Sequence, residues 1–256
     1  MAEGTSFPGR VAVMGVPVDP WTMVQTVAKT KELIGSDSFA HLIGVNADKV
    51  LQMRDDPEMD AIVRRCEIVN ADGASMVMAA RRLGVSVPER VAGIDLMGEL
   101  CALAENEGYR VFLLGAKREI VERTRDVLLG NYPELPIAGV RDGYFGEDEF
   151  DAVADEVRAS GAQITFVGIT SPKKERLIER FRELGLKGAY VGVGGSFDVV
   201  SGAIPRAPIW MQRAHLEWLF RMMQEPGRLA KRYVVGNARF MALLCKEEKR
   251  MKGASR

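Results

Sequence analysis

The sequence predicts an α/β protein with a Rossmann-like, doubly wound, mainly parallel sheet and a C-terminal helical appendage. Two observations predict this fold class. Short apolar runs of strand length alternate with segments of helical periodicity through most of the chain, which is the pattern of parallel βαβ units. After residue 203 the pattern changes to a basic stretch in which large apolar side chains recur at helical spacing. We therefore predict a body at 1–203 and an appendage at 204–256.

The predicted elements alternate along the body. The strands are expected at His41–Val45, Cys66–Asn70, Val111–Leu114, Ile164–Val167 and Tyr190–Val193, with a further short strand within Pro136–Tyr144. The helices are expected at Ala47–Asp55, Gly73–Leu83, Arg118–Leu129 and Pro172–Leu184. Because ligands of such sheets bind at the carboxyl ends of the strands, the loops that follow each strand are the place to search for a site.

Composition excludes several classes of protein. A chain of 256 residues with 47% hydrophobic content can bury a large core and is not intrinsically disordered. No window approaches the roughly 18 to 20 apolar residues that a transmembrane helix needs, so any membrane contact is expected to be peripheral. The first ten residues, MAEGTSFPGR, lack the features of a secretory signal, which predicts a cytoplasmic location.

The chain lacks the residues of the common cofactor and metal sites. Cys66, Cys101 and Cys245 form no CxxC pair, and His41 and His215 are the only histidines, which argues against a disulfide framework, a zinc site or a histidine-rich metal centre. There is no GxGxxG fingerprint in the expected position, no Walker loop and no GxSxG elbow. We therefore predict neither a bound metal nor a cofactor.

Charge is distributed unevenly along the chain. Residues 206–256 contain 12 basic and four acidic side chains, whereas the preceding residues contain 23 and 31, so the appendage carries +8 and the body −8. This asymmetry indicates an anionic partner, either nucleic acid or a membrane surface. Trp210, Trp218 and Phe220 cluster with Leu and Met instead of spreading along a groove, which favours lipid or a partner helix over nucleic acid. The apolar face suits a core or a homo-oligomer contact equally well.

Ionisable side chains near the strand ends supply the catalytic candidates. Asp72 can act as a general base at the mouth of a crevice, but it can equally cap the helix that follows, and Asn46 has the same two interpretations. Arg90 can hold an anionic leaving group or form a surface ion pair with Glu89 or Asp95. Asp198 can accept hydrogen bonds from a ligand or cap a helix.

A glycine-rich turn and nearby cations suggest capture of a phosphate. Gly192, Gly194 and Gly195 follow an apolar run, and such a turn lets backbone N–H groups approach an anion. Downstream, arginines alternate with large apolar side chains, a mixture that suits a lipid diphosphate better than a soluble metabolite. Lys173 and Lys174 precede a helix and can meet phosphate there, although a solvated pair is the ordinary outcome.

Several motifs, taken in order, resemble a known family. They are NADG, PERVAGIDL, VFLLGA, GITSPKKE, GVGGSFDVVSGAIPRAPIW and LEWLFRMMQEPGRLAKR, which together extend from about His41 to Arg232. This order resembles the WecG/TagA/CpsF family of bacterial glycosyltransferases. The resemblance implies an inverting, metal-independent enzyme that moves a sugar, commonly of the N-acetylmannosamine type, from a UDP donor to a polyprenyl-diphosphate-linked acceptor in cell-surface polysaccharide synthesis. It also implies an appendage that helps close the active site and brings it to the inner face of the membrane.

The resemblance assigns roles by position. Asp72 matches the catalytic base, Asn46 a donor-pocket residue and Arg90 an active-site arginine. Tyr144 and Asp198 match contacts to uridine diphosphate, and Arg221 and Arg228 match arginines that grip diphosphate. The remaining expected substrate-binding residues are Lys174, Gly194, Gly195, Lys231 and Arg232.

Two positions depart from the family pattern. Gly44 stands where the family usually has Thr, and Lys174 stands where it usually has Gln. Both lie beside the expected donor sugar, so the donor is open to another hexose or a uronic acid, whose carboxylate Lys174 could meet. A competing hypothesis is a non-catalytic, nucleotide-binding module that docks on a membrane or a partner.

Overall fold

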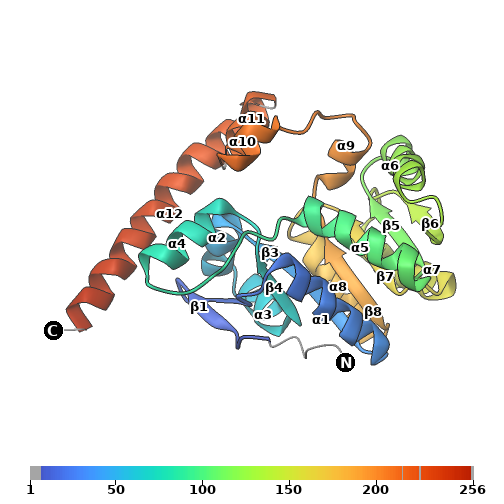
Figure 1. Cartoon of the computed structure of the whole chain (residues 1–256), viewed down its shortest axis with the longest axis horizontal. Coiled ribbons are helices and arrows are strands. Elements are labelled where there is room, and N and C mark those ends of the chain that lie inside the picture. Colours follow the sequence, from blue (N-terminus) through green and yellow to red (C-terminus); the bar gives the residue numbers. More distant parts are fainter. Residues whose placement is uncertain (1–6, 215, 225, 255–256) are drawn as a thin grey trace.

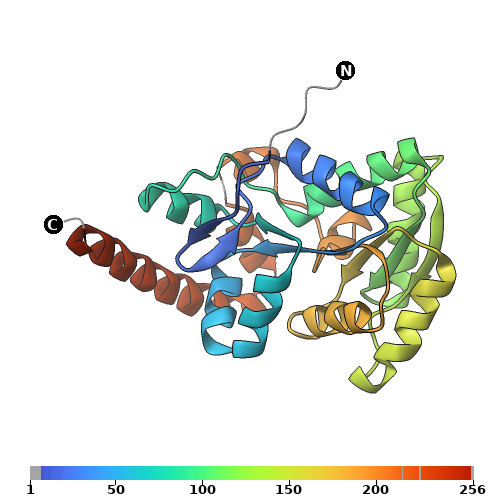
Figure 2. The same cartoon turned by 90° about the horizontal axis from the view of Figure 1, so that it is seen from below.

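The computed structural model describes residues 7–214, 216–224 and 226–254, without the side chains of residues 213, 228–232 and 254. It confirms the predicted fold class. Within the described residues, six parallel strands form one sheet in the order β4-β3-β8-β7-β5-β6, and helices cover both of its faces (Figures 1 and 2). A separate antiparallel hairpin and a C-terminal group of helices complete the chain.

The observed strands lie where the apolar runs predicted them. They are β3 (Phe39–Val45), β4 (Ile68–Ala71), β5 (Val111–Gly115), β6 (Ile137–Arg141), β7 (Ile164–Gly168) and β8 (Gly188–Gly192). β8 is displaced toward the N-terminus relative to its predicted range, because Gly188 already pairs with Phe39 of β3. The central strands are continuously apolar because both of their faces are covered, as in other parallel sheets.

The helices form two layers around the sheet. The helices of the body are α1 (Met23–Gly35), α2 (Ala47–Asp55), α3 (Pro57–Arg65), α4 (Ala74–Arg82), α5 (Gly93–Glu107), α6 (Arg118–Asn131), α7 (Phe150–Ser160), α8 (Lys173–Glu183) and α9 (Ser196–Val200), with a short 3₁₀ turn, Glu147–Glu149. α2 has the predicted bounds. Successive residues of a strand face opposite layers, so Leu42 packs in the cluster of α1, α5 and α6 while Ile43 packs in the cluster of α2 and α3.

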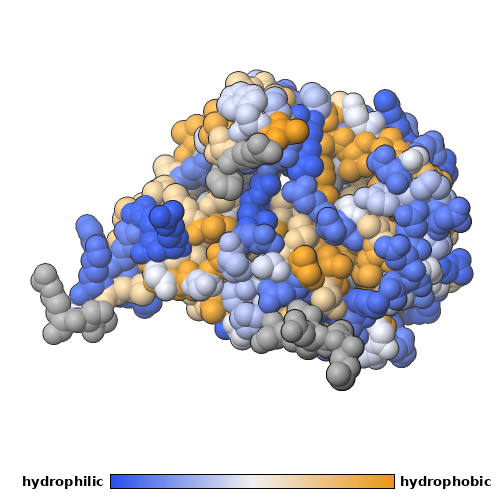
Figure 3. Space-filling view, viewed as in Figure 1, coloured by the Kyte–Doolittle hydropathy of each residue, from blue (hydrophilic) through white to orange (hydrophobic). Residues whose placement is uncertain are grey.

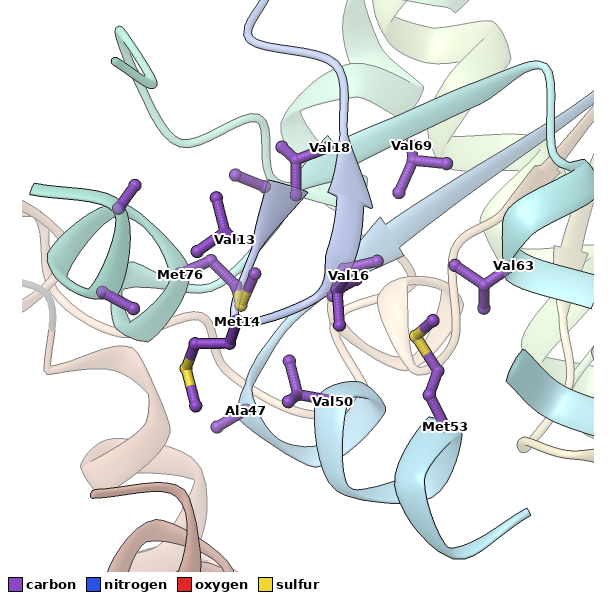
Figure 4. Close-up of a cluster of buried hydrophobic side chains, with 14 of the residues drawn as sticks. Val13, Met14, Val16, Val18, Ala47, Val50, Met53, Val63, Val69 and Met76 are labelled. Carbon is purple, nitrogen blue, oxygen red and sulfur yellow. The ribbon is translucent and has the colours of Figure 1, made fainter. Parts of the chain in front are cut away.

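The hairpin was not predicted, because each of its strands is only three residues long. β1 (Val11–Val13) and β2 (Val16–Val18) turn through Met14 and Gly15, both at positive φ. Their valines insert between α2, α3, α4 and β4 and form a buried cluster (Figure 4). The N-terminal segment thus closes one side of the core.

The appendage is helical, as predicted. It consists of α10 (Ile209–Arg213), α11 (Glu217–Gln224) and α12 (Pro226–Ala254), which extends along one flank of the molecule (Figure 1). α12 packs against α2, and its Phe240 and Leu244 are fully buried in the cluster that contains the hairpin. The middle of α12 therefore contributes these two side chains to the core of the body.

Candidate active site

Asp72 lies directly after β4, at the carboxyl edge of the sheet. Its Oδ1 accepts a hydrogen bond from the backbone N–H of Gly93, 3.2 Å away, which is the first residue of α5. The helix that follows Asp72 is α4, and its N-cap is Gly73, which makes no side-chain capping bond. Asp72 therefore does not cap the helix after it; it faces the N-terminus of a helix that lies across the crevice, where the helix dipole favours a negative charge.

The environment of Asp72 has opposing effects on its pKa. Burial raises the pKa of this carboxyl above its ordinary value. The hydrogen bond from Gly93 and the positive charges of Arg90, Arg221 and Lys174 act in the opposite direction. These three cations come from a loop, from the appendage and from α8, so the fold assembles three separate parts of the chain around one carboxyl group.

Gly44 makes room for Asp72. A Cβ atom at position 44 would lie 2.7 Å from the Cβ and 2.9 Å from the Oδ2 of Asp72, closer than two such atoms approach in proteins. β3 and β4 are paired here, with Gly44 opposite Asn70. This chain has Gly44 where the resemblance leads us to expect Thr. The space that a larger side chain would fill at position 44 is occupied here by the side chain of Asp72.

Lys174 lies in the first turn of α8 and is almost completely buried. Its side chain crosses the backbone of Gly192 at the end of β8, where an added Cβ would lie 2.9 Å from the lysine Cε. Its Nζ is 3.4 Å from Oε1 of Glu175. Lys174 is therefore a buried cation beside the glycine turn, not a solvated surface lysine. Lys173 has a structural role, since its Nζ donates to the backbone carbonyls of Gly143 and Phe145.

The other predicted body residues surround this edge of the sheet. Asn46 caps α2, with its Oδ1 accepting from the N–H of Lys49 at 3.0 Å, so its side-chain oxygen is engaged structurally. Gly194, at φ 52°, and Gly195 form the turn before α9, and Asp198 lies within α9. Tyr144 is 73% exposed, in the loop after β6.

A buried charge cluster that was not predicted lies next to Lys174. Lys49 and Glu175 form an ion pair of 2.8 Å, and both are almost completely buried. Lys49 also donates to Ser171 and Gln52. Burial alone would raise the pKa of Glu175, but the charges of Lys174 and Lys49 and the hydrogen bonds that Glu175 accepts from Lys49 and Ser171 lower it to about 2. The local sequence around Lys49 indicates only the start of α2, because its carboxylate partner is 126 residues away.

A second group of charges, predicted only in part, joins the appendage to the body. Arg90 donates to Oε2 of Glu217, the first residue of α11, and its Nη2 lies 3.7 Å from Asp95. Arg206 contacts Asp95 at 2.5 Å and Glu217 at 3.7 Å. The four side chains thus form a ring of alternating charge. The predicted pair of Arg90 with Asp95 is present, but its closer partner is an appendage carboxylate.

Arg221 lies one helical turn after Glu217. Both residues line a small cavity with Arg206, between α11, α5 and the segment after α9. The side chains of Arg228, Lys231 and Arg232, which were also predicted to bind substrate, lie outside the described part of the structure, although their backbones belong to α12. A larger cavity, of about 630 Å³, lies between α2 and α12, and none of the predicted site residues lines it.

No three His, Cys, Asp or Glu side chains in residues 7–214, 216–224 and 226–254 are grouped so that they could hold a metal ion. None of the helices in the same ranges combines the length and apolar character that crossing a bilayer requires.

Comparison with known proteins identifies the family. The model of the glycosyl transferase WecG/TagA/CpsF family matches residues 11–254, nearly the whole chain. The chain belongs to the WecG/TagA/CpsF family. It is therefore a glycosyltransferase of cell-surface polysaccharide synthesis, which acts on a sugar donor and an acceptor. Among solved structures, it is similar to a substrate-binding periplasmic protein from Ralstonia solanacearum, with 16% identity and a TM-score of 0.30, over 72% of this chain and 53% of that one.

Proposed function

We propose that this glycosyltransferase inverts the anomeric centre of a UDP-sugar, with Asp72 as general base, and transfers the sugar to a polyprenyl-diphosphate-linked acceptor. The observation that carries the proposal is the convergence of three cations on Asp72. A carboxylate that can take a proton and cations that can hold a diphosphate are the two requirements of such a transfer. Arg90, Arg221 and Lys174 all act electrostatically on Asp72.

The reaction is a single displacement. The hydroxyl oxygen of the acceptor attacks the anomeric carbon of the donor while Asp72 takes the hydroxyl proton. The bond between the anomeric carbon and the β-phosphate oxygen breaks, and the electron pair leaves with UDP. Arg90 and Arg221 offset the negative charge that develops on the leaving diphosphate, a role that a divalent metal has in other enzymes. One displacement inverts the configuration at this carbon.

A panel of UDP-sugars tests this function. Each donor is offered with a short-chain lipid-diphosphate acceptor, and UDP release and product stereochemistry are measured with and without EDTA. We expect transfer from at least one UDP-hexose or UDP-uronic acid, with inversion, at a rate that EDTA does not change. Retention of configuration would contradict the single displacement, and loss of the rate in EDTA would contradict the charge-stabilising role of the arginines.

Because Arg221 acts on the pKa of Asp72, we predict that the Arg221→Gln substitution shifts the pH profile of kcat/KM. A general base must be ionised, so the rate falls on the acid side as Asp72 takes up a proton. Arg221 lowers the pKa of Asp72, and its removal therefore raises that pKa. We expect the acid limb of kcat/KM for Arg221→Gln to move to higher pH.

The matched control is Arg239→Gln, which removes an appendage arginine that pairs with Asp55. Its acid limb is expected to coincide with that of the parent enzyme. An unchanged acid limb of kcat/KM in Arg221→Gln would show that Arg221 does not affect the pKa of the group that titrates.

We also propose that the appendage brings the enzyme to an anionic membrane surface. Among its described side chains, the exposed large apolar ones are Ile209, Trp210, Trp218, Met223, Val234, Val235 and Met251. They occur on the segment that carries the basic excess, and a basic, apolar helix of this kind binds in the interface of a bilayer. Figure 3 shows hydrophobic residues beside hydrophilic ones on the visible side of the appendage.

Sedimentation with anionic vesicles tests this contact. We expect the double variant Ile209→Ser/Trp210→Ser to bind less than the parent, because these side chains are 67% and 65% exposed on α10. Val24→Ser, which removes an equally exposed apolar side chain from α1, is the control and should bind like the parent. Equal sedimentation of the double variant and the parent would exclude α10 as the contact.

A further inference from the structure

The charge ring between the appendage and the body has a direct relation to the catalytic candidates. Arg90 and Glu217 are each about one fifth exposed, so their ion pair is shielded from bulk water more than a surface pair is. Arg206 and Asp95 extend the pair into the four-membered ring. Two of the four residues belong to the appendage and two to the body, so the ring fixes one relative to the other at this point.

Glu217 is the first residue of α11, and its contact with Arg90 determines which face of this helix is turned to the body. A carboxylate at a helix N-terminus is favoured by the helix dipole. Residues four apart lie on the same face of a helix, so the face that Glu217 turns to the body also carries Arg221. Both line the small cavity beside Ile94 of α5. Holding Glu217 therefore directs Arg221 toward the edge of the sheet.

Two arginines connected with Glu217 act electrostatically on Asp72. Arg90, which Glu217 binds, and Arg221, which Glu217 orients, are two of the three cations that lower its pKa. A single appendage carboxylate thus binds one arginine, Arg90, and lies one helical turn from the other, Arg221, and the charges of both act on the catalytic candidate. A side chain that had only to attach the appendage could have used any point of the interface, as Arg239 and Asp55 do farther along α12.

We propose that Glu217 is a positioning residue for the transfer reaction. It binds Arg90 and turns α11 so that Arg90 and Arg221 are held together over the site of the leaving diphosphate. The kinetic consequence of this inference rests on the proposed function. The orientation of α11 by Glu217 does not depend on that function. Misplacing a charge-stabilising group by about 1 Å can cost roughly 100-fold in rate, which is the scale of effect to expect.

The test compares Glu217→Gln with Glu217→Asp and with the control Asp55→Asn. Gln keeps the shape and loses the charge, Asp keeps the charge, and Asp55→Asn removes an exposed appendage–body pair away from Asp72. We expect Glu217→Gln to lower kcat by about 10-fold to 100-fold with little change in KM for the UDP-sugar, and Glu217→Asp to recover part of the loss. Asp55→Asn should keep the parental kcat.

A double-mutant cycle with Arg90→Gln separates positioning from attachment. Because Glu217 acts through Arg90 and also orients Arg221, the double variant should be slower than either single variant, but by less than the product of the two single losses. Losses in kcat that multiply, or a rise in KM that accounts for the whole effect, would overturn the proposal.

Hydrogen exchange of α11 provides the second readout. Glu217→Gln should accelerate exchange of the amides in residues 217–224, and Asp55→Asn should not. If the parent transfers no sugar from any donor, the proposed function fails, and the exchange measurement still decides whether Glu217 orients α11. Parental exchange in Glu217→Gln would overturn the inference irrespective of the reaction.

Discussion

Replacing Asp72 with Asn is expected to lower kcat by about 100-fold to 10,000-fold, the contribution of a general base. The amide has almost the same shape, and its oxygen can still accept the hydrogen bond from Gly93. It cannot take a proton from the acceptor. Because UDP would be held by Arg90, Arg221 and the glycine turn, its affinity should change little. Turnover assays with UDP calorimetry on the same preparation measure both quantities.

The same substitution is expected to stabilise the fold. Burial raises the pKa of Asp72, which means that the folded protein disfavours the ionised carboxyl relative to the unfolded chain. This penalty is absent at pH values below the unfolded pKa and is fully present above the folded pKa, so a neutral amide removes it at pH 7. A variant that is both inactive and at least as stable as the parent would indicate a functional carboxylate. Near-parental turnover of Asp72→Asn would show that another group is the base.

Replacing Glu175 with Gln is expected to destabilise the protein by about 3 to 5 kcal/mol, the usual cost of breaking a buried ion pair. The substitution leaves Lys49 buried without its carboxylate partner, and Lys174 loses a neighbouring negative charge. Urea denaturation of the parent and variant measures the difference. Glu183→Gln, at the end of the same helix in an exposed pair with Arg180, is the matched control and should leave the midpoint nearly unchanged.

The effect of pH on this cluster has a defined sign. The pKa of Glu175 is lowered to about 2 from 4.5, so its stabilising contribution is present above pH 4.5 and is lost as the pH falls toward 2. Without Glu175, Lys49 can relieve the penalty by losing its proton, since burial already lowers its pKa. Above pH 4.5, the loss of stability in Glu175→Gln should therefore become smaller as the pH rises. A loss that grows with pH above 4.5 would contradict this account of the cluster.

The parts of the fold that could be predicted from sequence are those with a strong local pattern. β5 and β7 are short apolar runs between turns, and α2 begins at a capping residue, Asn46. Such signals need no knowledge of the rest of the chain. The β1–β2 hairpin lacks one: three residues in each strand give no periodicity, and the turn has Met14 where a hairpin usually has Asn or Asp.

The candidate site could be predicted only in part, for a physical reason. Asp72 follows a recognisable strand, and topology alone brings strand ends together. The closer ion-pair partner of Arg90 is Glu217, which is 127 positions away in the sequence and could not be predicted from local pattern. For Lys174 the sequence favours a solvated lysine, whereas the structure buries its side chain against Gly192. Long-range electrostatic partners leave no periodic trace in a sequence.

The burial of Phe240 and Leu244 against the hairpin bears on how the protein is made. Residues 11–18 remain without part of their apolar cover until a helix more than two hundred residues later is in place. A ribosome delivers the chain from its N-terminus, so residues 11–18 emerge well before α12 and wait for it before this region is closed. We expect the nascent enzyme to stay susceptible to proteases near residues 11–18 until α12 has been released.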